Sequence, residues 1–224
     1  MSTHFSPDFL EFFKELAANN HKEWFDENRK RYEKEVKKPF EIFTQDAIDA
    51  LAKVNPELSS LDYKKCIFRI NRDIRFSKDK SPYKLNRSAA ISAGGKKDMT
   101  SPGMYFQMGP ENVRFYTGVY APAKPELTKI RQHIAGNLER FSSIMKDKKF
   151  KSIWGEPHGE KNKVIDKSLK EAAEKEPLLY NKGIYFYVDF PPEKVTDANL
   201  IKEMVKAYKA MTDFRLFMEE ALGN

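Results

Sequence analysis

The sequence predicts an α+β fold: a mainly antiparallel sheet with N-terminal, middle and C-terminal helices packed on it. Apolar residues recur at helical spacing near both ends and in the middle of the chain, and short strand-like runs lie between these segments. The turns between the runs are too short for crossover connections, so neighbouring strands must be antiparallel. The 224 residues contain no internal repeat or low-complexity linker, and we expect one domain over residues 1–224.

Two helical patterns open the chain. The first has phenylalanines and Leu16 at helical spacing after Ser6-Pro7, a typical cap and first turn, and it ends at Asn19-Asn20. The second runs from Trp24 to Leu51. Pro39 should kink or divide this second helix, because proline lacks an N–H and its ring clashes with the preceding turn.

The next part of the chain has strand character. Residues 65–76 are predicted to form a strand that enters an irregular segment, and residues 88–93 a second strand. Residues 104–108 and 113–120 are predicted to form a hairpin around the turn sequence Gly-Pro-Glu-Asn at 109–112.

Helical spacing returns in the second half of the chain. Residues 127–144 are predicted to be helical, with a break at Gly136-Asn137. Residues 147–166 show no clean period and are predicted to be a loop. Residues 183–190 should form a strand, and residues 200–222 a closing amphipathic helix. The apolar stripes predict a core that includes Phe9, Phe12, Trp24, Phe40, Phe43, Ile184, Phe186, Met204 and Met211.

The positive charge of the chain is concentrated in one segment. The net charge is +7 and the isoelectric point is about 9.2. Seven lysines and arginines lie between Arg69 and Arg87, against only Asp73 and Asp79, which places +5 of the charge in nineteen residues. A local excess of this kind indicates an anionic partner more strongly than the total charge does.

This segment, FRINRDIRFSKDKSPYK at residues 68–84, mixes cations with apolar side chains. If it is extended, Arg72 shares one face with its apolar neighbours Phe68, Ile70, Ile74 and Phe76. We therefore expect Arg72 to be substantially buried and held by at least two hydrogen bonds. A buried guanidinium is costly unless it meets a carboxylate, carbonyl oxygens or a bound anion.

We interpret the segment as a binding site for an anionic ligand that bears phosphate or carboxylate. Guanidinium groups match such oxyanions in a bidentate geometry, lysines add charge, and an aromatic ring between lysines can stack on a base. The ligand could be a phosphorylated metabolite, a nucleotide or the nucleic-acid backbone. The predicted ligand-binding residues are Arg69, Arg72, Arg75, Lys78, Lys80, Tyr83 and Lys84.

Two other interpretations stay open at this point. In the first, the protein is an enzyme acting on a phosphate-bearing substrate, with Asp73 or Asp79 as the acid or base and the arginines stabilising developing charge. In the second, Arg72 pairs with an internal acid such as Asp73 or Asp79, and the ion pairs form a structural network that supports a protein-interaction surface.

The strand at residues 113–120 offers a smaller candidate. Arg114, Tyr116 and Tyr120 share one of its faces, and Gly118 leaves space among them. Packing of the sheet face is the default interpretation. A pocket floor is the alternative, because glycine allows a close approach to the backbone.

Other site chemistries lack sequence support. Four scattered histidines without ligand spacing predict no metal site, and we expect no cofactor. Neither a phosphate-binding loop nor a G-x-S-x-G nucleophile motif is present. The single cysteine, Cys66, rules out an internal disulfide, suits a reducing compartment and is expected to be a small core residue.

The termini and hydropathy predict a cytoplasmic protein without a membrane partner. The N-terminal residues lack the basic and apolar regions of a signal peptide, and no apolar run approaches the length of a membrane span. The oligomeric state is left open.

Three motifs resemble those of an uncharacterised domain family, DUF2461. They are NNHKEWFDENRKRYE, RINRDIRFSKDKSPYK, and GVYAP followed by LTKIRQHI, and they occur in the same order over nearly the whole chain. Members also carry a Pro-Lys-Gly element where this chain has GEKNKVIDK, which leaves the role of residues 155–167 open. The resemblance implies a single α+β domain and brings no established activity.

Overall fold

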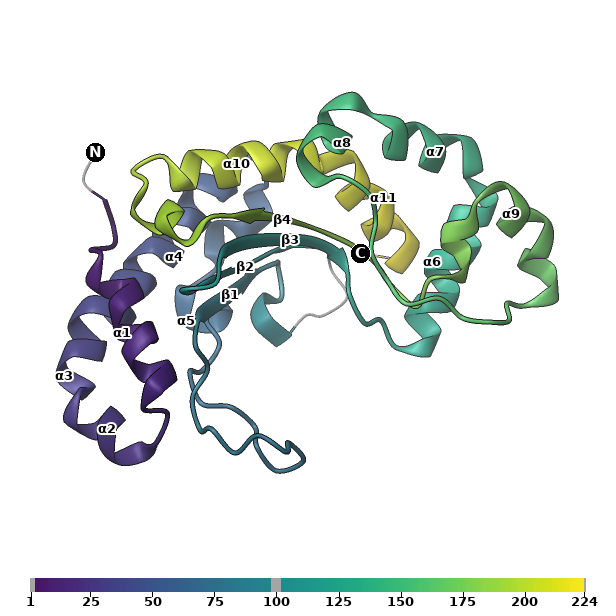
Figure 1. The fold of residues 1–224 in the computed structure, drawn as a ribbon. Coiled ribbons are helices and arrows are strands. Elements are labelled where there is room, and N and C mark those ends of the chain that lie inside the picture. The colour runs from purple at the N-terminus through teal and green to yellow at the C-terminus, as the bar shows by residue number, and fades with distance from the viewer. Residues whose placement is uncertain (1–2, 98–101, 224) are drawn as a thin grey trace. The chain divides into compact units, whose positions relative to one another are not determined.

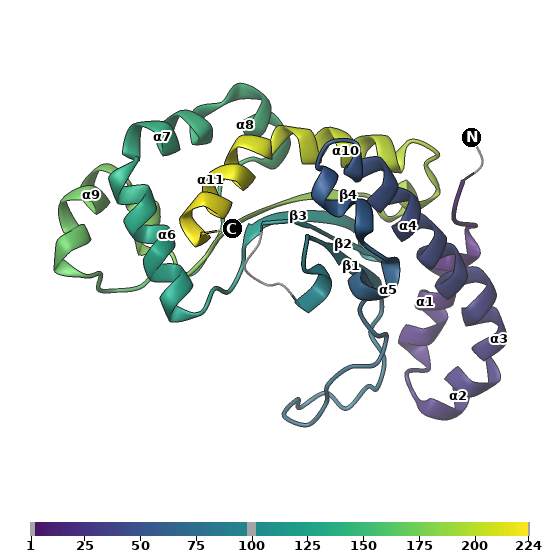
Figure 2. The same ribbon diagram turned by 180° about the vertical axis from the view of Figure 1, so that it is seen from behind.

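The computed structural model describes residues 3–97 and 102–223 (Figures 1 and 2). Its helices and strands follow the predicted order of helices, strands and helices around one late strand. The helices are α1 (Asp8–Ala18), α2 (Lys22–Glu27), α3 (Arg29–Arg31), α4 (Lys38–Ala52), α5 (Tyr63–Cys66), α6 (Lys124–Gly136), α7 (Leu138–Lys146), α8 (Lys148–Trp154), α9 (Lys170–Lys175), α10 (Leu200–Ala210) and α11 (Thr212–Leu222). The strands are β1 (Arg87–Ile91), β2 (Met104–Met108), β3 (Val113–Val119) and β4 (Ile184–Phe190).

The strands form one antiparallel sheet in the order β1-β2-β3-β4, which confirms the predicted α+β class. The hairpin of β2 and β3 has the predicted position, because Gly-Pro-Glu-Asn at residues 109–112 supplies the turn. Side chains alternate between buried and half-buried along both strands. This alternation is the period of two from which the hairpin was predicted.

The described residues group into two compact units. Unit 1 comprises the chain up to Ile91 together with Tyr105–Phe115 and Asp189–Val205. Unit 2 comprises Ser92–Met104, Tyr116–Val188 and the chain from Lys206 onward. That all 224 residues form a single domain stays a prediction.

Phenylalanine rings form the core of unit 1. The rings of Phe40 and Phe43 on α4 each lie 5.6 Å from the ring of Phe106 on β2, and Phe5 and Phe9 of the N-terminal segment pack edge to face at 4.7 Å. The core residues predicted from the sequence are buried throughout the chain, except for Trp24. That side chain is half-buried, at the outer side of the Phe12 ring.

The second predicted helix is divided at Asn28, between α2 and α3, and not at Pro39. Pro39 lies in the first turn of α4, and a π-helical turn at Tyr32–Lys37 leads directly into that helix. The N–H of Lys38 donates to the carbonyl of Glu33, five residues back. This wider turn continues the helical path past a residue that has no N–H of its own to donate.

Unit 2 has a separate aromatic core and one unpredicted helix. The ring of Phe150 on α8 lies 4.9 Å from Phe186 and 5.7 Å from Phe214, and the indole of Trp154 donates to the carbonyl of Ala207 at 3.1 Å. The prediction of a loop over residues 147–166 was therefore wrong for α8. Asp147 caps this helix by accepting from the N–H of Phe150 at 2.7 Å, but two turns are too short to show a clear period.

The other helix boundaries in unit 2 follow local signals. The break at Gly136-Asn137 is confirmed, since α6 ends at Gly136 and α7 begins at Leu138. The predicted C-terminal helix spans the expected residues but is divided at Met211 into α10 and α11. None of the helices in the described ranges is both long and apolar enough to cross a membrane.

Candidate functional site

Residues 68–86 form the basic loop, which connects α5 to β1 and extends away from the helices of unit 1 (Figure 1). Its two arms are paired only near the base: Arg72 N donates to the carbonyl of Pro82 and Lys84 N to the carbonyl of Ile70, each at 2.8 Å. Isolated bridges replace the continuous strand predicted over residues 65–76. The first two residues of that range belong to α5 instead.

The predicted strand phase holds only at the base of the basic loop. Ile70 is buried and Ile74 is half-buried, but Phe76 is 96 % exposed. No ladder hydrogen bond pairs the arms beyond Arg72 and Pro82 among the described residues, so the alternation of faces ends there. The expectation that Phe76 shares an inward face with Arg72 was wrong.

Arg72 is held by groups of the basic loop itself. Its side chain is 27 % exposed. The guanidinium donates to the carboxylate of Asp79, to the carbonyl of Ser81 at 3.1 Å and to the hydroxyl of Ser77 at 3.4 Å. The expected hydrogen bonds are present, although the side chain is only partly buried. Arg72 therefore closes the loop, as the structural interpretation of this residue requires.

The two aspartates of the basic loop are both paired. Asp73 accepts from Arg75 Nε at 2.9 Å and from Arg75 Nη2 at 2.7 Å, which lowers the pKa of Asp73. The hydroxyl and N–H of Ser81, and then Arg72, lower the pKa of Asp79 to about 2. A carboxylate with so low a pKa is a weak general base and is ionised, so it cannot serve as an acid near neutral pH.

The remaining cations of the basic loop form no ion pair within the described residues, although the charge of Arg69 adds to the effect of Arg75 in lowering the pKa of Asp73. Arg69 and Lys78 are exposed, and the exposed Lys80 donates to the carbonyl of Ile74 at 2.9 Å. Lys84 lies 5.5 Å from the centre of the Phe68 ring. Burial, with the charges of Arg87 and Arg69, lowers the pKa of Lys84. These cations therefore lie outside the two ion pairs that form within the loop.

Tyr83 fastens the basic loop to the N-terminal helices. Its ring stacks on Phe25, with centroids 4.1 Å apart and planes 17° apart. The side chain of Asn20 accepts from the N–H of Tyr83 at 3.1 Å and donates to its carbonyl at 3.0 Å. Tyr83 is buried. Its place in the structure is that of an anchor, and its ring face is already occupied by Phe25.

Tyr116 of β3 and Tyr120, directly after that strand, pack beside tyrosines of the neighbouring strand β4. Their rings lie 5.6 Å from Tyr187 and 5.0 Å from Tyr185, respectively. Gly118 has φ +107°, and a Cβ on it would lie 2.4 Å from the carbonyl oxygen of Ile184. The space at Gly118 is therefore taken by the β4 backbone, as in the packing interpretation.

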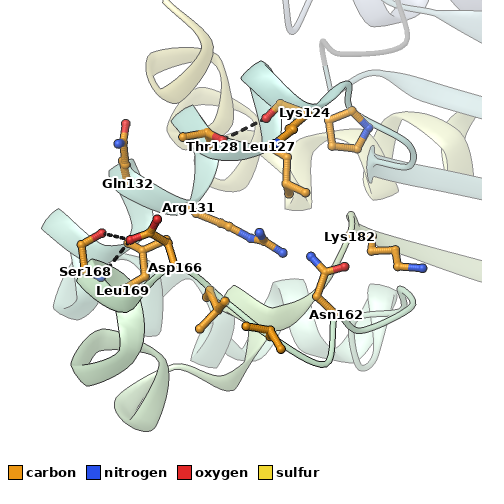
Figure 3. A pocket seen from close by; sticks show the side chains of 13 residues that line it. Lys124, Leu127, Thr128, Arg131, Gln132, Asn162, Asp166, Ser168, Leu169 and Lys182 are labelled. Atoms are coloured by element: carbon orange, nitrogen blue, oxygen red, sulfur yellow. Dashed lines mark hydrogen bonds between the residues drawn. The ribbon is translucent and has the colours of Figure 1, made fainter.

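Sequence reasoning missed a cavity of about 740 Å³ in unit 2 (Figure 3). Its walls come from α6, from residues 162–169 and from Lys182. Arg131 of α6 extends into it. One signal was available, because Arg131 follows Leu127 by four residues and so lies beside the apolar stripe of α6. The same kind of signal, a cation in phase with apolar residues, was the reason for selecting Arg72 in the basic loop.

Over the two described ranges, no group of three or more His, Cys, Asp or Glu side chains is arranged to hold a metal ion. Cys66 is buried, as expected for a core residue.

The chain matches one protein family, described as "Conserved hypothetical protein (DUF2461)", over residues 8–217. It matches none of the curated proteins and none of the solved structures with which it was compared. The match covers the basic loop and the unit 2 cavity alike, and its description gives no ligand and no reaction.

Proposed function

The chain belongs to the DUF2461 family, and from this premise we propose that it binds a phosphate-bearing ligand through the basic loop. The observation that carries the proposal is the division of charge within the loop. Asp73 pairs with Arg75, and Asp79 pairs with Arg72. Arg69 and Lys78 are exposed and form no ion pair in the described part of the chain.

The exposure of these cations favours an extended ligand. Arg69 lies at the base of the loop and Lys78 and Lys80 lie near its tip, where the ring of the exposed Phe76 is also found. Charges spread along an open loop suit successive phosphates, whereas a single small anion needs donors that converge. An exposed ring beside Arg75 supplies a stacking surface, as single-stranded nucleic acid uses. The backbone of nucleic acid is therefore the ligand we propose.

The two alternatives account for fewer of these features. An enzyme with Asp73 or Asp79 as base would need a carboxylate that is free to accept a proton, and both are held ionised by arginine or serine. A structural ion-pair network explains Arg72 and Arg75. It gives no role to the exposed charge of Lys78 and Lys80.

Fluorescence anisotropy of labelled single- and double-stranded oligonucleotides tests the proposal. Wild-type protein should bind at low salt with little sequence preference, because phosphate contacts carry no sequence information. The variant Arg69→Gln/Lys78→Gln should bind at least about tenfold more weakly, since it removes two phosphate contacts. Its melting temperature should match that of the wild type, because neither side chain has a polar partner among the described residues.

A matched control removes the same charge elsewhere in unit 1. Lys30 and Lys53 are exposed and form no ion pair within the described ranges, so Lys30→Gln/Lys53→Gln changes the net charge equally. This control should retain nearly all of the affinity. Equal losses of affinity in both variants would show that the effect comes from net charge alone. If the wild type does not bind at low salt, the proposal is wrong.

A further inference from the structure

The unit 2 cavity described above has the size of a small-molecule site. Its volume of about 740 Å³ lies within the usual range for ligand pockets. Three elements surround it: the N-terminal two turns of α6, the segment of residues 162–169, and Lys182 just before β4. All of these belong to unit 2, so the cavity is formed within one compact unit.

Arg131 brings a positive charge into this cavity without an acidic partner in the described residues. Its Nη2 donates to the carbonyls of Asn181 at 3.0 Å and Tyr180 at 3.4 Å, which fixes the guanidinium. Its Nε is buried and has no hydrogen-bond partner, and burial lowers the pKa of the side chain. A fixed, partly desolvated cation without a counter-ion is a costly arrangement that a bound anion would relieve.

Some of the other polar side chains of the cavity already have partners within the protein, and others can still bind a ligand. Asp166 accepts from the N–H and the hydroxyl of Ser168 at 2.9 and 2.6 Å, and Lys182 pairs with Glu160 at 2.8 Å. The Asn162 side chain forms no hydrogen bond with any described residue, and Figure 3 shows it beside the end of Arg131. Lys124, two turns before Arg131 on α6, is exposed and has no ion pair in the described ranges.

The remaining lining is apolar. Leu127 of α6 faces the segment that carries Ile165 and Leu169, both of which are buried. Val164 in the same segment is 78 % exposed, and Leu127 is half-buried. These two side chains present the apolar surface that a ligand in the cavity could contact.

We propose that this cavity binds a small organic anion, with its carboxylate or phosphate head on Arg131 and its apolar body against Leu127 and Val164. Nη1 of Arg131 forms no hydrogen bond with a described residue and supplies donors to the head. Asn162 adds a further donor, and Lys124 attracts the anion to the opening.

Four probes separate the parts of this proposal: hexanoate, hexyl phosphate, hexan-1-ol and inorganic phosphate. Titration calorimetry should give binding of hexanoate or hexyl phosphate, at least about tenfold weaker binding of hexan-1-ol, and weak binding of inorganic phosphate. The factor reflects the loss of charged hydrogen bonds to Arg131. The tighter of the two anionic probes identifies the head group as carboxylate or phosphate.

Arg131→Gln should weaken the anionic probes at least about tenfold and leave hexan-1-ol unchanged. The control Lys148→Gln removes an exposed charge from α8 and should change nothing. Since Arg131 also bonds to two carbonyls, its variant could unfold. In that case the NMR resonance of the Arg131 Nε–H in the wild type tests the proposal. It should shift when hexanoate is added and should not shift with hexan-1-ol. Equal binding of hexanoate and hexan-1-ol, or an unmoved resonance, would overturn the proposal.

Discussion

The ring of Tyr83 stacks on the ring of Phe25 at a centroid distance of 4.1 Å, which joins the base of the basic loop to α2. The two residues lie 58 positions apart in the sequence. Asn20 bonds to both backbone polar groups of Tyr83, so ring and backbone are fixed together. The position of the positive charges on the loop depends on this attachment.

Removal of the Tyr83 ring should destabilise unit 1. Tyr83→Ala deletes a buried aromatic side chain and its stacked partner contact, at a cost of about 3 kcal/mol in the free energy of unfolding. Tyr83→Phe keeps the ring and should stay close to wild type, because the Tyr83 hydroxyl has no hydrogen-bond partner among the described residues. Urea denaturation measures both. Equal stability of the alanine variant would show that the loop is not attached through this ring.

The Asp79 carboxylate should cause the folded protein to lose stability as the pH becomes acidic. Its pKa falls from the ordinary 3.8 to about 2 in the folded protein. A lowered folded pKa contributes stability that is fully present above the unfolded value and is lost as the pH falls toward 2. The melting temperature of Asp79→Asn should therefore lie below that of the wild type at pH 6, and the gap should close between pH 4 and pH 2. A gap that is constant over this range would contradict the assigned pairing with Arg72 and Ser81.

Gly118 should tolerate no side chain. Gly118→Ala places a methyl group against the Ile184 carbonyl and requires a residue with a side chain at φ +107°. We expect a loss of about 3 kcal/mol in unfolding free energy.

Gly136 at the end of α6 provides the matched control for Gly118. A Cβ there would meet nothing within 4 Å. Gly136→Ala should be neutral or stabilising by up to about 1 kcal/mol, because alanine favours the helix. Thermal melts of the two variants side by side check the contrast, and similar stabilities would mean that β3 and β4 are not packed as described.

The sequence was sufficient for features that depend on local patterns. The β2 and β3 hairpin and the break before α7 each follow from turn residues or a fixed period. The short α8 was missed because two helical turns hold too few apolar positions to establish a period.

The sequence located the basic loop correctly as a charged segment, but the geometry predicted for it was wrong. A period of two predicted an inward Phe76, whereas the arms of the loop pair only as far as Arg72 and Pro82. Whether a strand continues depends on the hydrogen bonds that the opposite arm can offer, and the alternation of residues along one arm does not reveal them. The cavity at Arg131 was missed because its walls come from separate segments of the chain, α6, residues 162–169 and Lys182, which no local pattern brings together.

The salt dependence of oligonucleotide binding tests the central claim most directly, because each phosphate contact adds about 0.9 to the slope of log affinity against log salt on duplex DNA. Slopes are to be measured by anisotropy for the wild type, Arg69→Gln/Lys78→Gln and Lys30→Gln/Lys53→Gln. The account predicts a slope that is shallower by about 2 in the loop variant and unchanged in the control. The same slope in all three proteins would show that the exposed cations of the basic loop do not contact phosphate.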